Sequence, residues 1–252
     1  MGDTPPIRRP RASFVPHASI VDIPFKYLII GVTSLPLFGL LICTFISVWK
    51  TYEEVTESVC GVSNFVPSIS AVTGITPQLY IWRYLIGFQS GPRLILAAAY
   101  YQQHKLYASR LPKPFYFTIL AKSALLLHMI DLVSFVGVAY VSNRENFPVH
   151  ERLFIVFLVS STMYMGVMLT IYSRLNAEGL LAPRVKHAYW MKTVFFSLTF
   201  VFIILLSYFH YAHRTKCYPN GKQSDAATGF LSTSLAFLIS KMLNICLMCT
   251  VL

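Results

Sequence analysis

Hydrophobic residues gather in six long blocks along the chain, and short polar segments separate these blocks. Each block holds the ~20 residues that an α-helix needs to cross about 30 Å of hydrocarbon. The blocks are too long for the strands of a transmembrane barrel, which appear as alternating segments of about 10 residues. The pattern therefore predicts an all-α fold, a polytopic membrane bundle of six helices. The predicted spans are residues 27–49, 78–100, 115–141, 153–173, 190–210 and 229–252.

Composition supports this interpretation. Of the 252 residues, 55% are hydrophobic and only 12% are charged, about half the charged share of an ordinary soluble domain. Such a chain is too apolar to be disordered over most of its length. We expect one transmembrane domain over residues 27–252. Residues 1–26 begin with prolines and a basic cluster (Arg8, Arg9 and Arg11), which predicts an arm without a core.

The distribution of positive charge predicts the orientation. Lys and Arg of short loops favour the cytoplasmic side, and the two sets of alternate loops carry 11 and six of them. Both termini are thus predicted to be cytoplasmic, with loops 50–77, 142–152 and 211–228 on the lumenal side. The net charge of +11 then reflects topology and contact with anionic headgroups. Since no soluble module is present, we expect no nucleic-acid partner.

Two of the five cysteines, Cys60 and Cys217, lie in predicted loops, both on the lumenal, oxidising side. We predict a disulfide between them, which would join the first lumenal loop to the third. The alternative is a pair of free thiols that face the same compartment. No Cys or His spacing resembles a structural zinc site, and we expect neither a metal nor a cofactor.

Ionisable residues inside the predicted spans need a partner or a cavity. From the rise per residue, Arg83 and Asp131 lie ~9 and ~4.5 Å lumenal of the centres of spans two and three, which predicts that they pair. His128 is three residues from Asp131 and shares its helical face. These residues form either a structural clasp or an acid/base site. Arg93 and Lys122 lie on the cytoplasmic side, where we expect them to extend towards headgroups.

The loop that precedes the second span mixes apolar residues with turn formers over residues 60–77. It is too apolar to be freely solvated, so we expect it at the lumenal membrane face or inside the bundle. It is either a packed cap or a platform for lipid headgroups. His150 and Glu151 begin the fourth span on the same side. They are candidates for a general base, or they bind loop backbone.

Tyr80, Trp82 and Arg83 begin the second span next to this loop. Aromatic side chains anchor helices at membrane interfaces, and a guanidinium donates two parallel hydrogen bonds to a phosphate. We therefore expect these three residues to bind a lipid substrate in a lumenal cleft, and Arg93 is a further candidate for substrate binding. The alternative is that Tyr80 and Trp82 only mark the membrane boundary.

Three stretches of the chain resemble the post-GPI-attachment-to-proteins factor 2 family. They are CGVSNFVPSIS at 60–70, PQLYIWRYLIGFQSGPRL at 77–94 and SNRENFPVHERLFIVFLVSS at 142–161. The resemblance covers about residues 20–217 and fades beyond them, where Lys241 near the middle of the last span departs from it. Its pattern includes Pro77, Gln78, Tyr80, Trp82, Arg83, Gly87, Ser90, Pro92, Arg93, Asp131, His150 and Glu151.

The resemblance implies a multi-pass protein of the Golgi apparatus or the endoplasmic reticulum that remodels the lipid of GPI anchors. The implied step installs a saturated fatty chain on the lyso-GPI intermediate and supports stable surface expression of GPI-anchored proteins. These proteins and their lipid are the implied partners. No nucleophile elbow or acyltransferase box is present, so an enzyme and an accessory factor both remain open. The alternatives are a six-span transporter or channel and a membrane-traffic modulator of the autophagy type.

Overall fold

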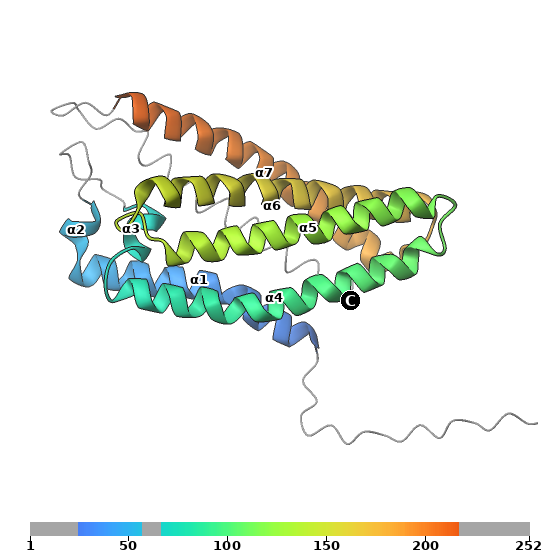
Figure 1. Cartoon of the computed structure of the whole chain (residues 1–252), viewed down its shortest axis with the longest axis horizontal. Helices are drawn as coiled ribbons and strands as arrows, with labels where there is room; N and C mark the ends of the chain where they lie inside the picture. The colour runs from blue at the N-terminus through green and yellow to red at the C-terminus, as the bar shows by residue number, and fades with distance from the viewer. Residues whose placement is uncertain (1–24, 57–66, 217–252) are drawn as a thin grey trace, which may run out of the picture.

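The computed structural model describes residues 25–56 and 67–216, which form α-helices and no strand. Five of these helices are long and two are short, as drawn in Figure 1. The long helices are α1 (Phe25–Lys50), α4 (Gln78–Ala108), α5 (Pro114–Tyr140), α6 (Phe147–Ala177) and α7 (Pro183–Lys216). The short helices are α2 (Tyr52–Thr56) and α3 (Ile69–Thr73). The all-α prediction is confirmed for this part of the chain.

Each of the first five predicted spans coincides with a long helix, and α4 and α7 continue well beyond the predicted ends. Among the residues that the structure describes, four helices are long and apolar enough to cross a membrane, namely α1, α5, α6 and the Val185–Tyr208 part of α7. Helix α4 is long enough to cross a membrane but less apolar, because Arg83, Gln89 and Arg93 interrupt its apolar sequence. The sixth predicted span, Cys60 and Cys217 lie outside the described residues.

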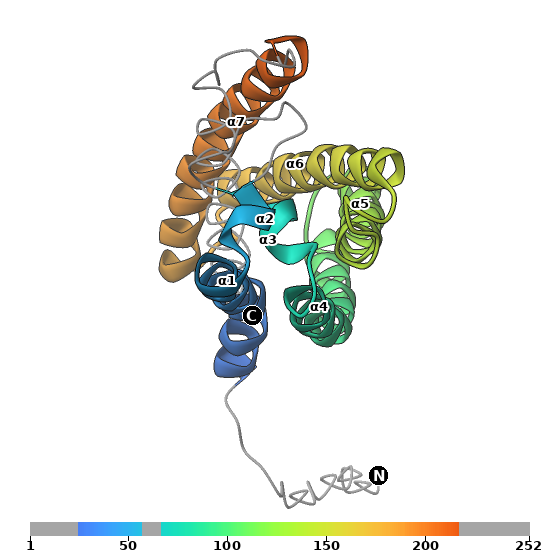
Figure 2. The same cartoon turned by 90° about the vertical axis from the view of Figure 1, so that its left-hand side faces the viewer.

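The long helices follow one another in space as they do in sequence. Helix α1 packs on α4, α4 on α5, α5 on α6 and α6 on α7. Short connections join α4 to α5 and α5 to α6, so these neighbours run antiparallel (Figure 1). Helices α2 and α3 lie together at one end of the bundle, beside the end of α1 and the start of α4 (Figure 2). We call this the α3 end.

Local signals fix where α6 begins and ends. The side chain of Asn146 accepts a hydrogen bond from the backbone N–H of Val149, and Pro148 stands in the first turn. At the other end Gly179 has a φ of +68°, a conformation that favours glycine. Its N–H and that of Leu180 bond the carbonyls of Asn176 and Leu175, which is the Schellman motif. The chain therefore turns back directly into α7.

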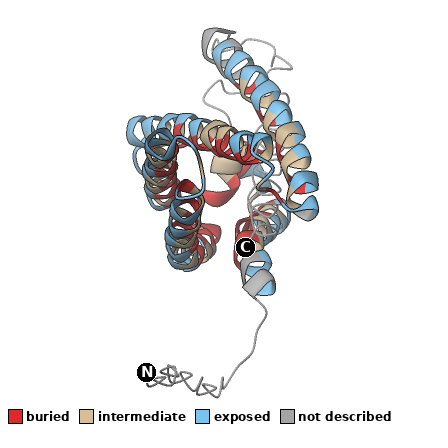
Figure 3. Ribbon diagram, turned by 90° about the vertical axis from the view of Figure 1, so that its right-hand side faces the viewer, coloured by how far each residue is buried: buried red, intermediate tan, exposed pale blue. Residues whose placement is uncertain are grey.

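Buried residues line the inside of the bundle and exposed residues cover its outer faces (Figure 3). The outer faces are themselves apolar: Phe45, Phe115 and Trp190 are among many large exposed side chains. Such a surface suits a lipid environment. The inside contains two apolar clusters. One lies nearer the α3 end and includes Trp82 and Phe157. The other is built around Tyr100, Phe117, Tyr164 and Tyr172.

A buried ion pair joins α4 to α5 between the two clusters. The Arg93 guanidinium donates to the Asp131 carboxylate at 2.7 Å, and both side chains are almost fully buried. Two predictions were therefore wrong: Arg83 does not pair with Asp131, and Arg93 does not extend to headgroups. The error came from the length of α4. Arg93 is the midpoint of the observed helix, whereas the predicted span had its midpoint four residues earlier, ~6 Å away.

We predict that Asp131→Ala destabilises the bundle by about 3–5 kcal/mol, because it leaves the Arg93 guanidinium buried without its carboxylate. Thermal unfolding of the purified protein in detergent measures this loss. Lys122→Ala, an exposed position on the same helix, is the matched control and should change stability by less than about 0.5 kcal/mol. The double variant Arg93→Met with Asp131→Leu should recover most of the loss. Equal stability of Asp131→Ala and the unsubstituted protein would contradict the assignment.

Candidate functional site

A histidine, a serine and a backbone carbonyl form a continuous chain of hydrogen bonds at the α3 end. His150 Nδ1 lies 2.7 Å from the carbonyl oxygen of Val141, and His150 Nε2 lies 3.1 Å from Ser70 Oγ. A carbonyl only accepts, so Nδ1 carries the hydrogen. In the neutral imidazole Nε2 is then the acceptor, and the Ser70 hydroxyl donates to it. His150 is nearly buried, whereas Ser70 is half-buried.

Helix α3 is short because both of its ends are fixed. Ser68 caps it by accepting from the N–H of Ala71. Gly74 ends it, where a Cβ would lie 2.6 Å from the Ser70 carbonyl oxygen and 2.7 Å from Asn143 Oδ1. Only glycine permits this approach, so the connection between α5 and α6 packs directly on α3. The sequence allows either a packed cap or a lipid platform for residues 60–77, and in the structure the described part of this segment packs against the bundle end.

Gln78 holds the start of α4 against the end of α1. Its side chain is fully buried, and Nε2 donates to Ser47 Oγ and to Thr51 Oγ1, each at 3.1 Å. The Cys43 thiol donates in turn to the backbone carbonyl of Gln78 at 3.5 Å. These contacts join α1 and α4 beside α3, which packs on both helices. The Ser47 hydroxyl also donates to the Val72 carbonyl of α3.

Arg83 binds the end of α5 and the connection that follows it. Its guanidinium donates to the Tyr140 carbonyl at 2.6 Å and to the Glu145 carboxylate, and Glu145 also accepts from the N–H of Ser142. The bond from Arg83 lowers the pKa of Glu145, and the bond from Ser142 lowers it further. Arg83 and His150 therefore hold the consecutive carbonyls of Tyr140 and Val141, which the last turn of a helix leaves without partners.

The structure separates the other predicted site residues. Tyr80 is exposed, but Trp82 is buried in the cluster near the α3 end. The predicted role of Trp82 as an interface anchor was therefore wrong. Glu151 is half-buried next to His150. Ser70 was missed, because it stands in a segment without periodicity and belongs to no recognised motif.

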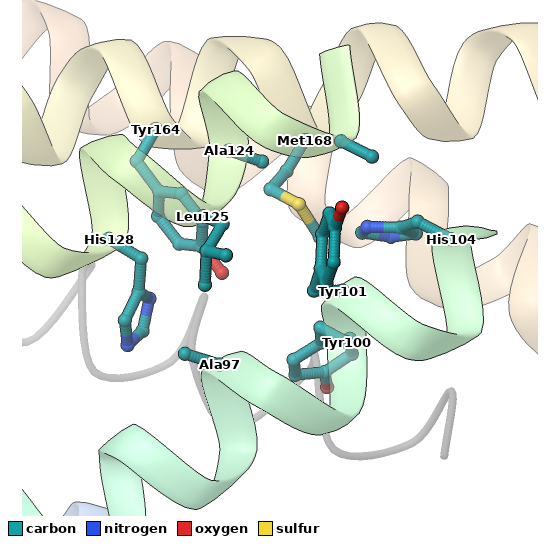
Figure 4. Close-up of a pocket in the computed structure, with 10 residues that line it drawn as sticks. Ala97, Tyr100, Tyr101, His104, Ala124, Leu125, His128, Tyr164 and Met168 are labelled. Atoms are coloured by element: carbon teal, nitrogen blue, oxygen red, sulfur yellow. The ribbon is translucent and has the colours of Figure 1, made fainter. Parts of the chain in front are cut away.

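His128 and Asp131 are both buried, as expected of residues on one helical face. The His128 ring meets the Tyr164 ring edge to face, with 4.9 Å between centroids. Beside it lies a cavity of about 10 Å³ between α4, α5 and α6 (Figure 4). Such a volume holds roughly one water and no acyl chain. In the part of the chain that the structure describes, no three His, Cys, Asp or Glu residues gather as metal ligands would.

Comparison with known proteins is consistent with this architecture. The model of the Frag1/DRAM/Sfk1/Cwh43P N-terminal domain matches residues 24–252. It continues past residue 217, where we had expected the resemblance to fade. No solved structure matches the chain.

Three similar relatives carry related names. "Post-GPI attachment to proteins factor 2-like" of Drosophila melanogaster is 35% identical over 77% of this chain and 60% of its own length. "Acyltransferase PGAP2" of Danio rerio is 32% identical over 81% of this chain and 89% of its own. The Xenopus tropicalis protein of that name is 34% identical over 76% of each chain. The chain thus spans less than two thirds of the fly relative but most of the two vertebrate ones.

The apolar outer surface and the polar contacts at the bundle end define a multi-pass, all-α membrane protein. This chain belongs to the Frag1/DRAM/Sfk1/Cwh43 family, and within it to the post-GPI attachment to proteins factor 2 proteins.

The lowered pKa of Glu145 predicts a pH-dependent connection between α5 and α6. The carboxylate contact stabilises this segment above the ordinary pKa of 4.5 and is lost as the pH falls through the lowered value. Amide hydrogen exchange over residues 141–146, corrected for its intrinsic pH dependence, should therefore accelerate at low pH. Glu145→Gln should remove this acceleration, and Glu178→Gln at the other end of α6 should retain it. The same acceleration in both variants would refute the assignment.

Proposed function

We propose that this protein remodels the lipid of GPI anchors and installs a saturated fatty chain on the lyso-GPI intermediate. The names of its relatives support the pathway, and the word "acyltransferase" in two of them supports the reaction. The observation that carries the proposal within this chain is the position of the His150 ring between the Val141 carbonyl and Ser70. Its Nε2 faces a half-buried hydroxyl at the end of the bundle. A nitrogen placed in this way is suited to take the proton of a lipid hydroxyl as a general base.

The proposed topology places this end of the bundle on the lumenal side. We propose six spans with both termini in the cytoplasm, in the membrane of the Golgi apparatus or the endoplasmic reticulum. Helix α4 lies between α1 and α5, two helices apolar enough to span, so we propose that it crosses with them. Its Arg93 is neutralised by Asp131 rather than exposed to lipid. The glycerol backbone of a GPI anchor in the lumenal leaflet then lies near the α3 end.

The arrangement of the polar residues favours this role over a transporter or channel. Residues proposed to line a path, such as Arg93 and Asp131, bind one another inside the bundle. The cavity beside His128 has room for about one water.

The specific partners of the proposed function are GPI-anchored proteins and their lipid.

We predict that His150→Ala blocks saturated-chain installation, because loss of a general base typically slows a reaction by about 10²–10⁴-fold. The measurement is the lipid composition of GPI anchors in cells that lack their own remodelling activity and express each variant. His187→Ala, an exposed histidine near the start of α7, is the control and should restore saturated chains. Protein level and location should be equal in both variants. Normal remodelling by His150→Ala would overturn the role of His150, and no remodelling by the unsubstituted protein would overturn the function.

The proposed topology predicts that tags at both termini are accessible to antibodies after selective permeabilisation of the plasma membrane. The split of 11 against six basic loop residues is its physical basis. A tag inserted after Asn146, in the connection at the α3 end, should stay protected until the internal membranes are opened. Protection of both terminal tags would refute this orientation.

A further inference from the structure

The hydroxyl of Ser70 has a side-chain partner from another helix, unlike most hydroxyls in the described helices. Serine and threonine in a helix commonly donate to a carbonyl one turn earlier. Thr73, Ser134 and Ser160 do so, to Ile69, Ile130 and Val156. Ser70 instead directs its hydroxyl to the imidazole of His150, a residue 80 positions away in the sequence.

The order of groups matches that of an activated nucleophile. A hydroxyl lies 3.1 Å from one imidazole nitrogen, and the opposite ring nitrogen donates to a fixed acceptor at 2.7 Å. In nucleophilic catalysis the base lies within about 3.2 Å of the nucleophile and a third group orients the base. Here the Val141 carbonyl is the orienting group, and in the neutral imidazole it places the hydrogen on Nδ1 and leaves Nε2 as the acceptor.

Contacts of Gly74 and of Arg83 with the segment that joins α5 to α6 hold Ser70 and His150 in place. Gly74 allows Asn143 and the connection between α5 and α6 to approach the turn that carries Ser70. Arg83 fixes the neighbouring carbonyl of Tyr140. Ser70 itself keeps part of its surface open, whereas the ring of His150 is nearly buried. A nucleophile has to be reachable, and its base has to be oriented.

We propose that Ser70 is the nucleophile of an acyl transfer and carries the acyl chain as a serine ester, with a membrane glycerophospholipid as donor. This inference rests on the proposed function and names its covalent step. Ser70 lies at the end of a bundle whose outer faces suit lipid, so the ester carbonyls of surrounding phospholipids are the acyl groups nearest to it. Exchange of one ester for another also needs no oxidant, reductant or nucleotide.

The reaction balances in two steps. In the first, Ser70 Oγ forms a bond to the acyl carbonyl of the phospholipid, and His150 Nε2 takes the serine proton. The bond from the carbonyl to the glycerol oxygen breaks, and that oxygen receives the proton to leave as a lysophospholipid. In the second, the hydroxyl of the lyso-anchor attacks the serine ester and gives its proton to Nε2. Ser70 Oγ leaves, takes the proton back, and the anchor holds the new ester.

The test uses the purified full-length protein in vesicles of glycerophospholipid with alkyne-tagged saturated chains. Mass spectrometry of the rapidly denatured protein should find the tagged acyl group on Ser70. Ser70→Ala should lack the adduct and lose at least about 10²-fold in the initial rate of acyl transfer. Ser70→Cys should carry the chain as a thioester that neutral hydroxylamine releases, unlike the oxygen ester of the unsubstituted protein. Thr73→Val, which removes a hydroxyl from the same helix, should leave the adduct unchanged.

The outcomes separate this inference from the proposed function. If Ser70→Ala restores saturated chains on GPI anchors in cells as well as the unsubstituted protein does, the serine assignment is wrong and the function stands. If the unsubstituted protein carries the adduct on Ser70 but restores no saturated GPI chain, the remodelling function is wrong and the nucleophile stands. Labelling from an acyl thioester but not from the phospholipid would overturn the donor class.

Discussion

The two carbonyls at the end of α5 are the constraint on which the bundle end depends. A helix leaves its last carbonyls without intrahelical partners, and buried carbonyls without partners are costly. Arg83 of α4 donates to the carbonyl of Tyr140, and His150 of α6 donates to that of Val141. These bonds connect three helices through one short stretch of backbone. They also fix the tautomer of His150, so the packing of the bundle end determines the chemistry of its imidazole.

The long apolar blocks were enough to predict the five long helices of the described residues, because long apolar segments in lipid have few alternatives to a helix. It was not enough to predict their lengths. Helix α4 continues to Ala108 through a polar segment that no hydropathy pattern assigns to a membrane. That extension moved its midpoint and changed which arginine reaches Asp131. When depth is measured from the observed midpoints of α4 and α5, Arg93 lies ~6 Å from the depth of Asp131 and Arg83 lies ~9 Å from it.

The candidate site was predictable only in part. His150 stood out as a histidine at the start of a span, and the loop of residues 60–77 stood out by its composition. The contact between Ser70 and His150 was not predictable, because the two residues are 80 positions apart. It depends on the close approach of Asn143 to Gly74. Trp82 illustrates the opposite case. Its type and position fit a membrane boundary, yet the face on which it lies packs against Gly39 of α1.

The pair of Arg93 and Asp131 has a consequence for biogenesis. An arginine at the centre of a helix raises the free energy of membrane insertion by about 2.5–3.5 kcal/mol, and its carboxylate partner is synthesised 38 residues later. In the proposed topology, α4 alone is therefore a poor substrate for the insertion machinery, whereas α4 and α5 together enter lipid as a neutralised hairpin. The two helices then form one unit of membrane integration. We expect a substitution at either charge to affect how much protein reaches the membrane, as well as how stable the protein is once there.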